Sequence, residues 1–92
     1  MSVEEFWEKH YKPAALMKLK KTTREQYFSL YSRWIAPVIA RKRLAALEPG
    51  DVEIVIARSI EGGMSPATAR HIRKVISAIY SKAKKQIGRA HV

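Results

Sequence analysis

The sequence marks a break between two helices in the stretch Gly62-Gly63-Met64-Ser65-Pro66-Ala67-Thr68-Ala69. The glycine pair is typical of a helix end, where the chain reverses at the C′ position. Ser65 is a suitable N-cap for the next helix, and Pro66 fits the first helical position, where its missing N–H costs nothing. The stretch therefore predicts one helix that stops at the glycines and a second that starts at Pro66.

The helix expected over about residues 66–87 separates apolar from basic side chains. At about 100° per residue, its apolar residues fall within an arc of roughly 140°, which predicts a stripe facing the core. These residues are Ala69, Ile72, Val75, Ile76, Ile79, Tyr80, Ala83 and Ile87. The opposite arc holds Arg70, Arg73, Lys74, Ser77, Ser81, Lys84 and Lys85. No Asp or Glu follows Glu61, so the pattern favours contact with a polyanion over a merely solvated face. Gly88 is the expected stop.

A first helix is expected over about residues 3–12, opened by a capping box that Ser2 forms with Glu5. Pro13 is expected to interrupt it, and residues 14–21 are ambiguous.

A second helix is expected to start at Thr22 or Thr23, because Thr22-Thr23-Arg24-Glu25 resembles another capping box. Pro37 disfavours helix at Ala36 and is expected to end it there. The apolar residues at helical spacing are Tyr27, Leu30, Tyr31, Trp34, Ile35 and Val38.

A turn is expected at Pro49-Gly50, and Asp51 is the expected N-cap of a third helix. This helix carries Val52, Val55, Ile56 and Ile60. No two-residue alternation is long enough to argue a sheet, so the chain predicts an all-α fold.

The composition favours a single small domain spanning residues 1–92, with one modest core. The chain has 18 Lys and Arg against 8 Asp and Glu, and this net charge of +10 favours an acidic partner. No apolar run approaches the roughly 20 residues of a membrane span, so no membrane partner is expected. Without cysteine there is no disulfide framework, and the acidic N-terminus does not resemble a signal peptide. The expected compartment is the cytoplasm.

No pattern of catalytic or metal-ligating residues stands out. The histidines His10, His71 and His91 have no partner at metal-ligand spacing, and the chain has no Gly-rich phosphate loop. The tyrosines and tryptophans lie on apolar stripes, so they are expected to pack in the core and not to act as nucleophiles. We therefore expect no catalytic residue, no metal and no cofactor.

Two basic clusters on expected helices supply the candidate DNA-binding residues. Lysines suit phosphate, arginines suit phosphate or guanine, and hydroxyls can donate to the DNA backbone. The cluster at the second helix start is Lys20, Lys21, Thr23 and Arg24, close to Lys18. The cluster on the last helix is Thr68, Arg70, Arg73, Lys74, Ser77 and Lys84. For Thr68, a structural role in the first helical turn is an equal alternative. A third basic group, Arg41-Lys42-Arg43, sits in a loop and is weaker evidence.

The order of these motifs resembles a known family. The specific parts are Gly63-Met64-Ser65-Pro66-Ala67-Thr68-Ala69 and the run Ser77-Ala78-Ile79-Tyr80-Ser81-Lys82-Ala83. Over roughly residues 3–90, the chain resembles the core-binding, SAM-like N-terminal domain of tyrosine recombinases of the phage integrase type. One departure is Ala40, where the family commonly has Gly, and this puts the local turn in question.

The resemblance implies a small orthogonal four-helix bundle that clamps double-stranded DNA at a recombination core site. The other half of the clamp would be a catalytic domain of the same parent chain, which is expected to be absent here, and other integrase protomers would be partners on DNA. His71-Ile72-Arg73 is one residue too short for the family's His-x-x-Arg motif, so this chain alone is not expected to be an enzyme. Two alternatives stay open: a standalone helical DNA-binding regulator, and a basic helical module for protein interactions.

Overall fold

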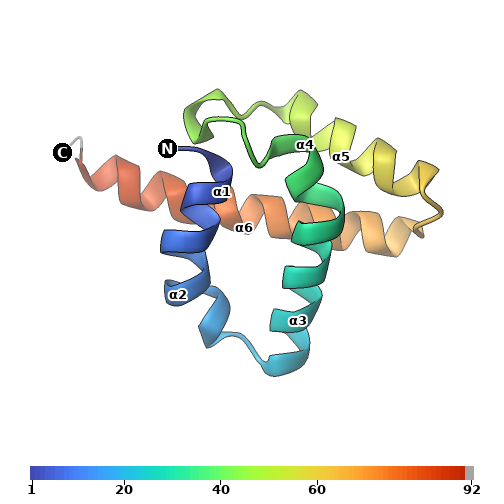
Figure 1. Ribbon diagram of the computed structural model, residues 1–92, viewed down its shortest axis with the longest axis horizontal. Coiled ribbons are helices and arrows are strands. Elements are labelled where there is room, and N and C mark those ends of the chain that lie inside the picture. Colours follow the sequence, from blue (N-terminus) through green and yellow to red (C-terminus); the bar gives the residue numbers. More distant parts are fainter. Residues whose placement is uncertain (91–92) are drawn as a thin grey trace.

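The structure is a computed structural model, which describes the backbone of residues 1–90 and the side chains of residues 1–85. Over this range the chain is all-helical and forms no strand, as the sequence predicts, and it folds into four helices (Figure 1). Two 3₁₀ turns, η2 (Leu16–Lys18) and η4 (Leu44–Ala46), lie in the connections.

The first helix is continuous from Val3 to Ala14 and combines α1 (Val3–Phe6), η1 (Trp7–Tyr11) and α2 (Lys12–Ala14). Ser2 caps it as predicted, because its Oγ accepts the Glu5 N–H at 3.1 Å. The second helix combines α3 (Lys21–Leu30), η3 (Tyr31–Ile35) and α4 (Ala36–Ile39).

Both helices continue through the proline that was expected to end them. The segments η1 and η3 are π-helical: the Lys12 N–H donates to the Trp7 carbonyl, and the Ala36 N–H donates to the Tyr31 carbonyl. A proline in a regular α-helix clashes with the preceding turn. The wider π-turn just before it gives the ring room. The end expected at Ala36 is therefore wrong, because the second helix continues to Ile39, whereas the first helix ends at Ala14, one residue past the expected interruption at Pro13.

The π-turn also changes which side chains of the second helix are buried. Tyr27, Tyr31, Ile35 and Ile39, spaced by four residues, are all buried together with Leu30. In a regular α-helix, positions spaced by four drift by about 40° per step, whereas a wider turn keeps them in line. Consequently Trp34 and Val38, expected in the stripe, are only partly buried.

Two helix starts differ from the predictions. The second helix starts at Lys21 with Lys20 at the N-cap and no capping side chain, so the Thr caps are wrong: threonines lie inside its first turn. The third helix, α5 (Pro49–Glu61), starts before Asp51, whose Oδ2 accepts the Glu48 N–H at 2.9 Å. With Pro49 at its first position, the helix starts three residues before the expected Val52, so Asp51 is not the N-cap and Pro49-Gly50 is not a separate turn.

The predicted break between the last two helices is confirmed. Gly63 has φ +91°, and the N–H groups of Gly63 and Met64 donate to the Ile60 and Ser59 carbonyls, which closes α5 with a Schellman motif. The fourth helix, α6 (Pro66–Ala90), starts at Pro66, with the Ser65 Oγ accepting the Thr68 N–H at 3.2 Å.

The stop expected at Gly88 is wrong, because α6 continues to Ala90. Glycine inside a helix costs only about 1 kcal/mol relative to alanine, which does not by itself end a long helix. The side chain of Ile87 and all of His91 lie outside the described residues.

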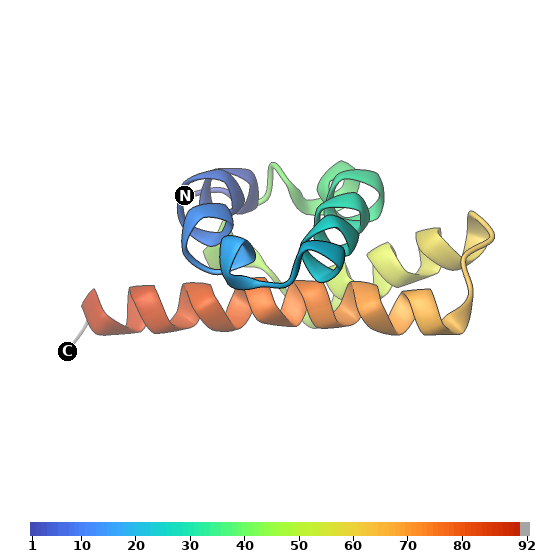
Figure 2. The ribbon, with the colours of Figure 1, turned by 90° about the horizontal axis from the view of Figure 1, so that it is seen from below.

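Figure 2 shows that α6 runs along one edge of the molecule and that the first and second helices lie on one side of it. The first and second helices cross it steeply, and α5 packs along it (Figure 1). The α6 stripe in the core consists of Ala69, Ile72, Val75, Ile76, Ile79 and Ala83. Tyr80 was expected there but is 49% exposed, since it lies at the edge of the stripe. Ile60 of α5 is likewise 46% exposed, and the buried neighbour is Ser59, whose hydroxyl donates to the Ile56 carbonyl. None of the described helices is long and apolar enough to span a bilayer.

Candidate nucleic-acid interface

One side of α6 faces away from the first and second helices (Figure 2), and two residues on it, Ser77 and Ser81, border a groove against the start of α5. We call this the outer face of α6 and define it by six exposed residues: Arg70, Lys74, Ser77, Ser81, Lys84 and Lys85. It spans about 22 Å, at 1.5 Å per residue. Since α6 carries no Asp or Glu, the whole face is cationic or neutral.

The cations of the outer face are not neutralised by neighbours. Within the described part of the chain, no ion pair involves Arg70, Lys74 or Lys84. Their charge is therefore available to an external anion.

Arg73 differs from these cations. Its Nη2 lies 2.9 Å from Oε1 of Glu53 on α5, and both side chains are more than half exposed. Glu53 lies twenty residues before Arg73 in the sequence, so the acid-free pattern of α6 does not reveal this partner. An acid on a neighbouring helix can be found only once the packing of the two helices is known.

Thr68 and Ser77 occupy different environments. The Thr68 hydroxyl lies 3.2 Å from the Ser65 Oγ, and the residue is partly buried in the first turn of α6. This contact supports the structural alternative for Thr68. Ser77 is exposed at the centre of the outer face.

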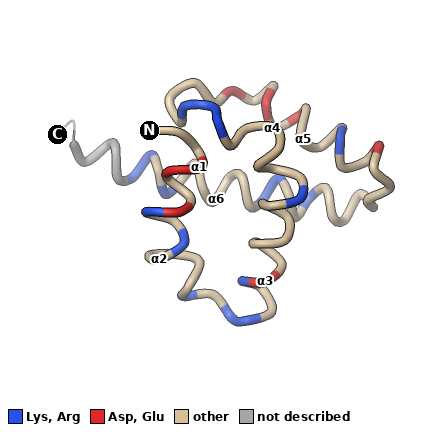
Figure 3. Tube along the Cα trace, viewed as in Figure 1, with Lys and Arg blue, Asp and Glu red and all other residues tan. Residues whose placement is uncertain are grey.

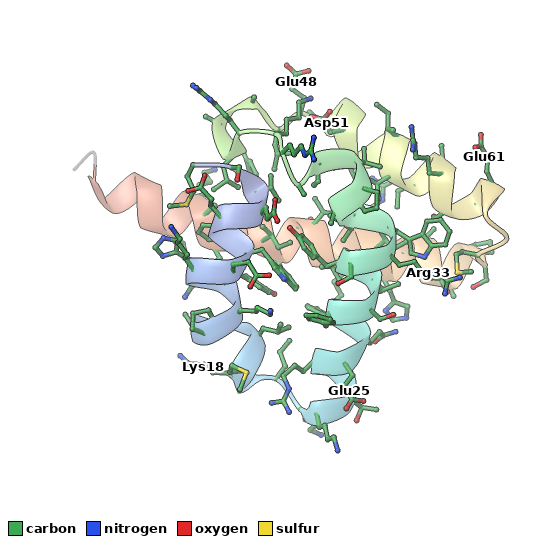
Figure 4. All side chains as sticks on the ribbon, in the orientation of Figure 1. Lys18, Glu25, Arg33, Glu48, Asp51 and Glu61 are labelled. Atoms are coloured by element: carbon green, nitrogen blue, oxygen red, sulfur yellow. The ribbon has the colours of Figure 1, made fainter. Side chains whose placement is uncertain are left out.

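The second predicted cluster lies at the connection between α2 and α3, away from α6 (Figure 1, Figure 3). Lys20 and Lys21 are exposed there, whereas Thr23 and Arg24 are partly buried. Figure 4 shows Lys18 and Glu25 at this same end of the molecule. The structure thus does not merge the two clusters into one continuous patch.

Arg24 faces an open groove of about 550 Å³ between the first and second helices. The groove is lined by apolar side chains that include the buried Leu16 and the exposed Met17 and Phe28. Side chains as large and apolar as those of Met17 and Phe28 are usually buried. Lys12 lies 5.0 Å above the Phe28 ring and also pairs with Glu8 at 3.1 Å. The groove is therefore apolar with mixed charge at its rim.

The basic triplet Arg41-Lys42-Arg43 has structural contacts. The Ala40 and Lys42 carbonyls accept the Glu4 and Val3 N–H groups, each at 2.9 Å, and so cap the start of α1. Ala40 itself has helical angles, φ −56° and ψ −38°, which need no glycine. The question raised by that departure from the family is thereby removed.

Lys42 also forms a hydrogen-bonded ion pair with Asp51. This bond, followed by the one from the Glu48 N–H, holds the pKa of the Asp51 carboxyl below its ordinary value of 3.8. From the sequence, Asp51 was expected only as a helix cap, because no local pattern indicates which cation contacts its carboxylate.

The titratable groups do not assemble a reactive site in the described residues. Burial raises the pKa of both Tyr11 and Tyr31 to about 12, which makes their hydroxyls poorer nucleophiles. No three His, Cys, Asp or Glu side chains come together there in a way that could hold a metal ion.

Comparison with known proteins found no match to a family model, to a curated protein or to a solved structure. The likeness to integrase core-binding domains therefore rests on the sequence motifs.

Proposed function

We propose that this chain is a DNA-binding domain that sets the outer face of α6 against the phosphates of duplex DNA. The observation that carries the proposal is that the outer face, which carries no Asp or Glu, lies on the side of α6 away from the first and second helices. Duplex DNA presents one negative charge per about 1.7 Å of axis, so a cationic face about 22 Å long meets many phosphates.

Individual residues take distinct roles in this proposal. Lys74 and Lys84 contact phosphates, and Arg70 contacts phosphate or the edge of a guanine. Ser77 donates a hydrogen bond to the DNA backbone. Lys20, Lys21 and Arg24, with Thr23, contact the duplex at a second, separate place, where they limit how the domain can tilt on it. Arg73 and Thr68 contribute less in the free protein, because both are engaged within the fold.

We further propose that the domain is the core-binding module of a phage-integrase-type tyrosine recombinase, with a SAM-like orthogonal bundle. Two of the motif residues that carry the resemblance, Ser65 and Thr68, form the start of α6, and two others, Ile79 and Ala83, are buried in the core. The motifs thus have structural roles in this fold, which supports the proposal. In this role it would work in a bacterial cytoplasm with a catalytic domain of its parent chain and with further protomers on DNA. Alone it would not cut or join DNA, and supercoiled plasmid incubated with it should keep its topology.

The apolar groove beside Phe28 favours one alternative, a module for protein interactions. In that case the net charge only aids solubility, and no salt-sensitive DNA binding would be seen. A standalone regulator, by contrast, would bind DNA as a dimer, which sedimentation would separate from a monomeric module.

The test is fluorescence anisotropy with a labelled duplex over a range of salt concentrations. We expect a Kd of about 1 μM or weaker at physiological salt, since the contact is mainly electrostatic. If about five phosphates are neutralised, log K should fall with log salt at a slope near −4 to −5. Absence of binding even at about 50 mM salt would contradict the proposal.

A further inference from the structure

Arg73 lies at the border between the outer face of α6 and the contact of α6 with α5. It is one helical turn from Arg70 and one from Ser77, so it is a neighbour of both on the helix surface. Its guanidinium is held by the Glu53 carboxylate at 2.9 Å, with 51% of the Arg73 side chain exposed. Among the cations of α6 with a described side chain, Arg73 is the one found in an ion pair.

Glu53 belongs to an acidic edge at the start of α5, together with Glu48 and Asp51. Figure 3 shows acidic segments at the start of α5 and basic segments along α6. Asp51 already accepts hydrogen bonds from Lys42 and from the Glu48 N–H. Within the described residues, Glu53 is the carboxylate of this edge that forms an ion pair with α6.

We infer that Glu53 is an internal competitor of DNA: its carboxylate holds the Arg73 guanidinium where a phosphate would otherwise bind. Carboxylate and phosphate make the same kind of charge-assisted hydrogen bonds to arginine. An exposed ion pair is weak, so Arg73 can leave Glu53 without disturbing the fold, but the pair must break before Arg73 reaches a phosphate. The inference rests on the proposed function and adds that Glu53 lowers the affinity of α6 for DNA.

The test compares Glu53→Gln with Glu61→Gln in the duplex-binding assay. Glu61 lies eight residues further along α5, about 12 Å away, and Figure 4 shows it at the opposite end of that helix from Asp51. Both variants raise the net charge by one. We expect Glu53→Gln to tighten binding about two- to fivefold, the size expected for an exposed ion pair, and Glu61→Gln to tighten it clearly less.

A double-mutant cycle with Arg73→Gln shows whether Glu53 acts through Arg73. In the Arg73→Gln background, the gain from Glu53→Gln should disappear. An equal gain in both backgrounds would mean general charge repulsion and would overturn the inference, as would an equal gain from Glu61→Gln. If the unaltered protein binds duplex and Glu53→Gln changes nothing, only this inference fails. If the unaltered protein binds no duplex, the proposed function fails and the inference falls with it.

Discussion

The indole ring of Trp7 stacks on the phenol ring of Tyr31, with ring centroids 4.0 Å apart and planes 7° from parallel. Each residue is the first of a π-helical segment, so the two wide turns of the first and second helices meet at this stack. Both side chains are buried, yet neither the Trp7 Nε1 nor the Tyr31 hydroxyl has a hydrogen-bond partner within the described residues. The contact therefore joins two helices through their rings and not through their polar atoms.

Removing the Tyr31 hydroxyl should not weaken the fold. Tyr31→Phe keeps the stacked ring and deletes a buried polar atom without a partner, so we expect the free energy of unfolding to stay the same or rise by about 1 kcal/mol. Trp7→Ala removes the stack and should cost about 3–5 kcal/mol. Urea titration measures both, with Tyr80→Phe as the exposed control. A loss above about 1 kcal/mol in Tyr31→Phe would show that the hydroxyl is hydrogen-bonded in solution.

The two glycines at opposite ends of α5 should respond with opposite signs to alanine. Gly63 has φ +91°, which an L side chain adopts only under strain, so Gly63→Ala should cost about 1–2 kcal/mol. Gly50 lies inside the first turn of α5 with nothing within 4 Å of an added Cβ. Gly50→Ala should therefore stabilise by about 0.4–1 kcal/mol. Thermal unfolding of both variants decides this, and equal shifts in one direction would contradict the assigned helix end.

Asp51 should give the domain an acid-sensitive component of stability. Its pKa is lower in the folded protein than in the unfolded chain, chiefly because Lys42 donates to it. The stabilisation is therefore present at pH above about 3.8 and is lost as the pH falls through the lower, folded-state pKa. Asp51→Asn should remove this part of the pH dependence in urea titrations between about pH 6 and 2, whereas Glu25→Gln, an exposed control, should not. Equal pH dependence in Asp51→Asn and in the unaltered protein would show that the ion pair does not form.

Features of the fold that depend on neighbouring residues in the sequence could be predicted, whereas those that depend on contacts between helices could not. The helix break at residues 61–66 and most of the α6 stripe follow from caps and from the 3.6-residue period, and both are confirmed. The continuation of two helices past Pro13 and Pro37 could not be predicted, because no local pattern marks the π-turns that precede these prolines. Each π-turn begins at Trp7 or Tyr31, and these two residues meet only in the packed structure. In the second helix, Ile35 of the expected stripe is buried, but Trp34 and Val38 are only partly buried, and Ile39, which was not in that stripe, is buried.

The candidate site shows the same division. The outer face of α6 follows from helical spacing within one segment, and its residues are exposed as expected. The Arg73–Glu53 and Lys42–Asp51 pairs each join residues from different elements, so only the packed structure identifies them. The DNA-binding role of the predicted residues stays a prediction.

The most direct test of the central claim compares two double charge reversals in the duplex-binding assay. Arg70→Glu with Lys74→Glu reverses the outer face of α6, and Lys9→Glu with Arg58→Glu reverses two exposed cations elsewhere. Each pair lowers the net charge by four, from +10 to +6. With circular dichroism confirming that both variants fold, we expect the first to lose about tenfold or more in affinity and the second less than about threefold. Equal losses would contradict the account, because net charge alone would then explain the binding and the outer face of α6 would have no special part in it.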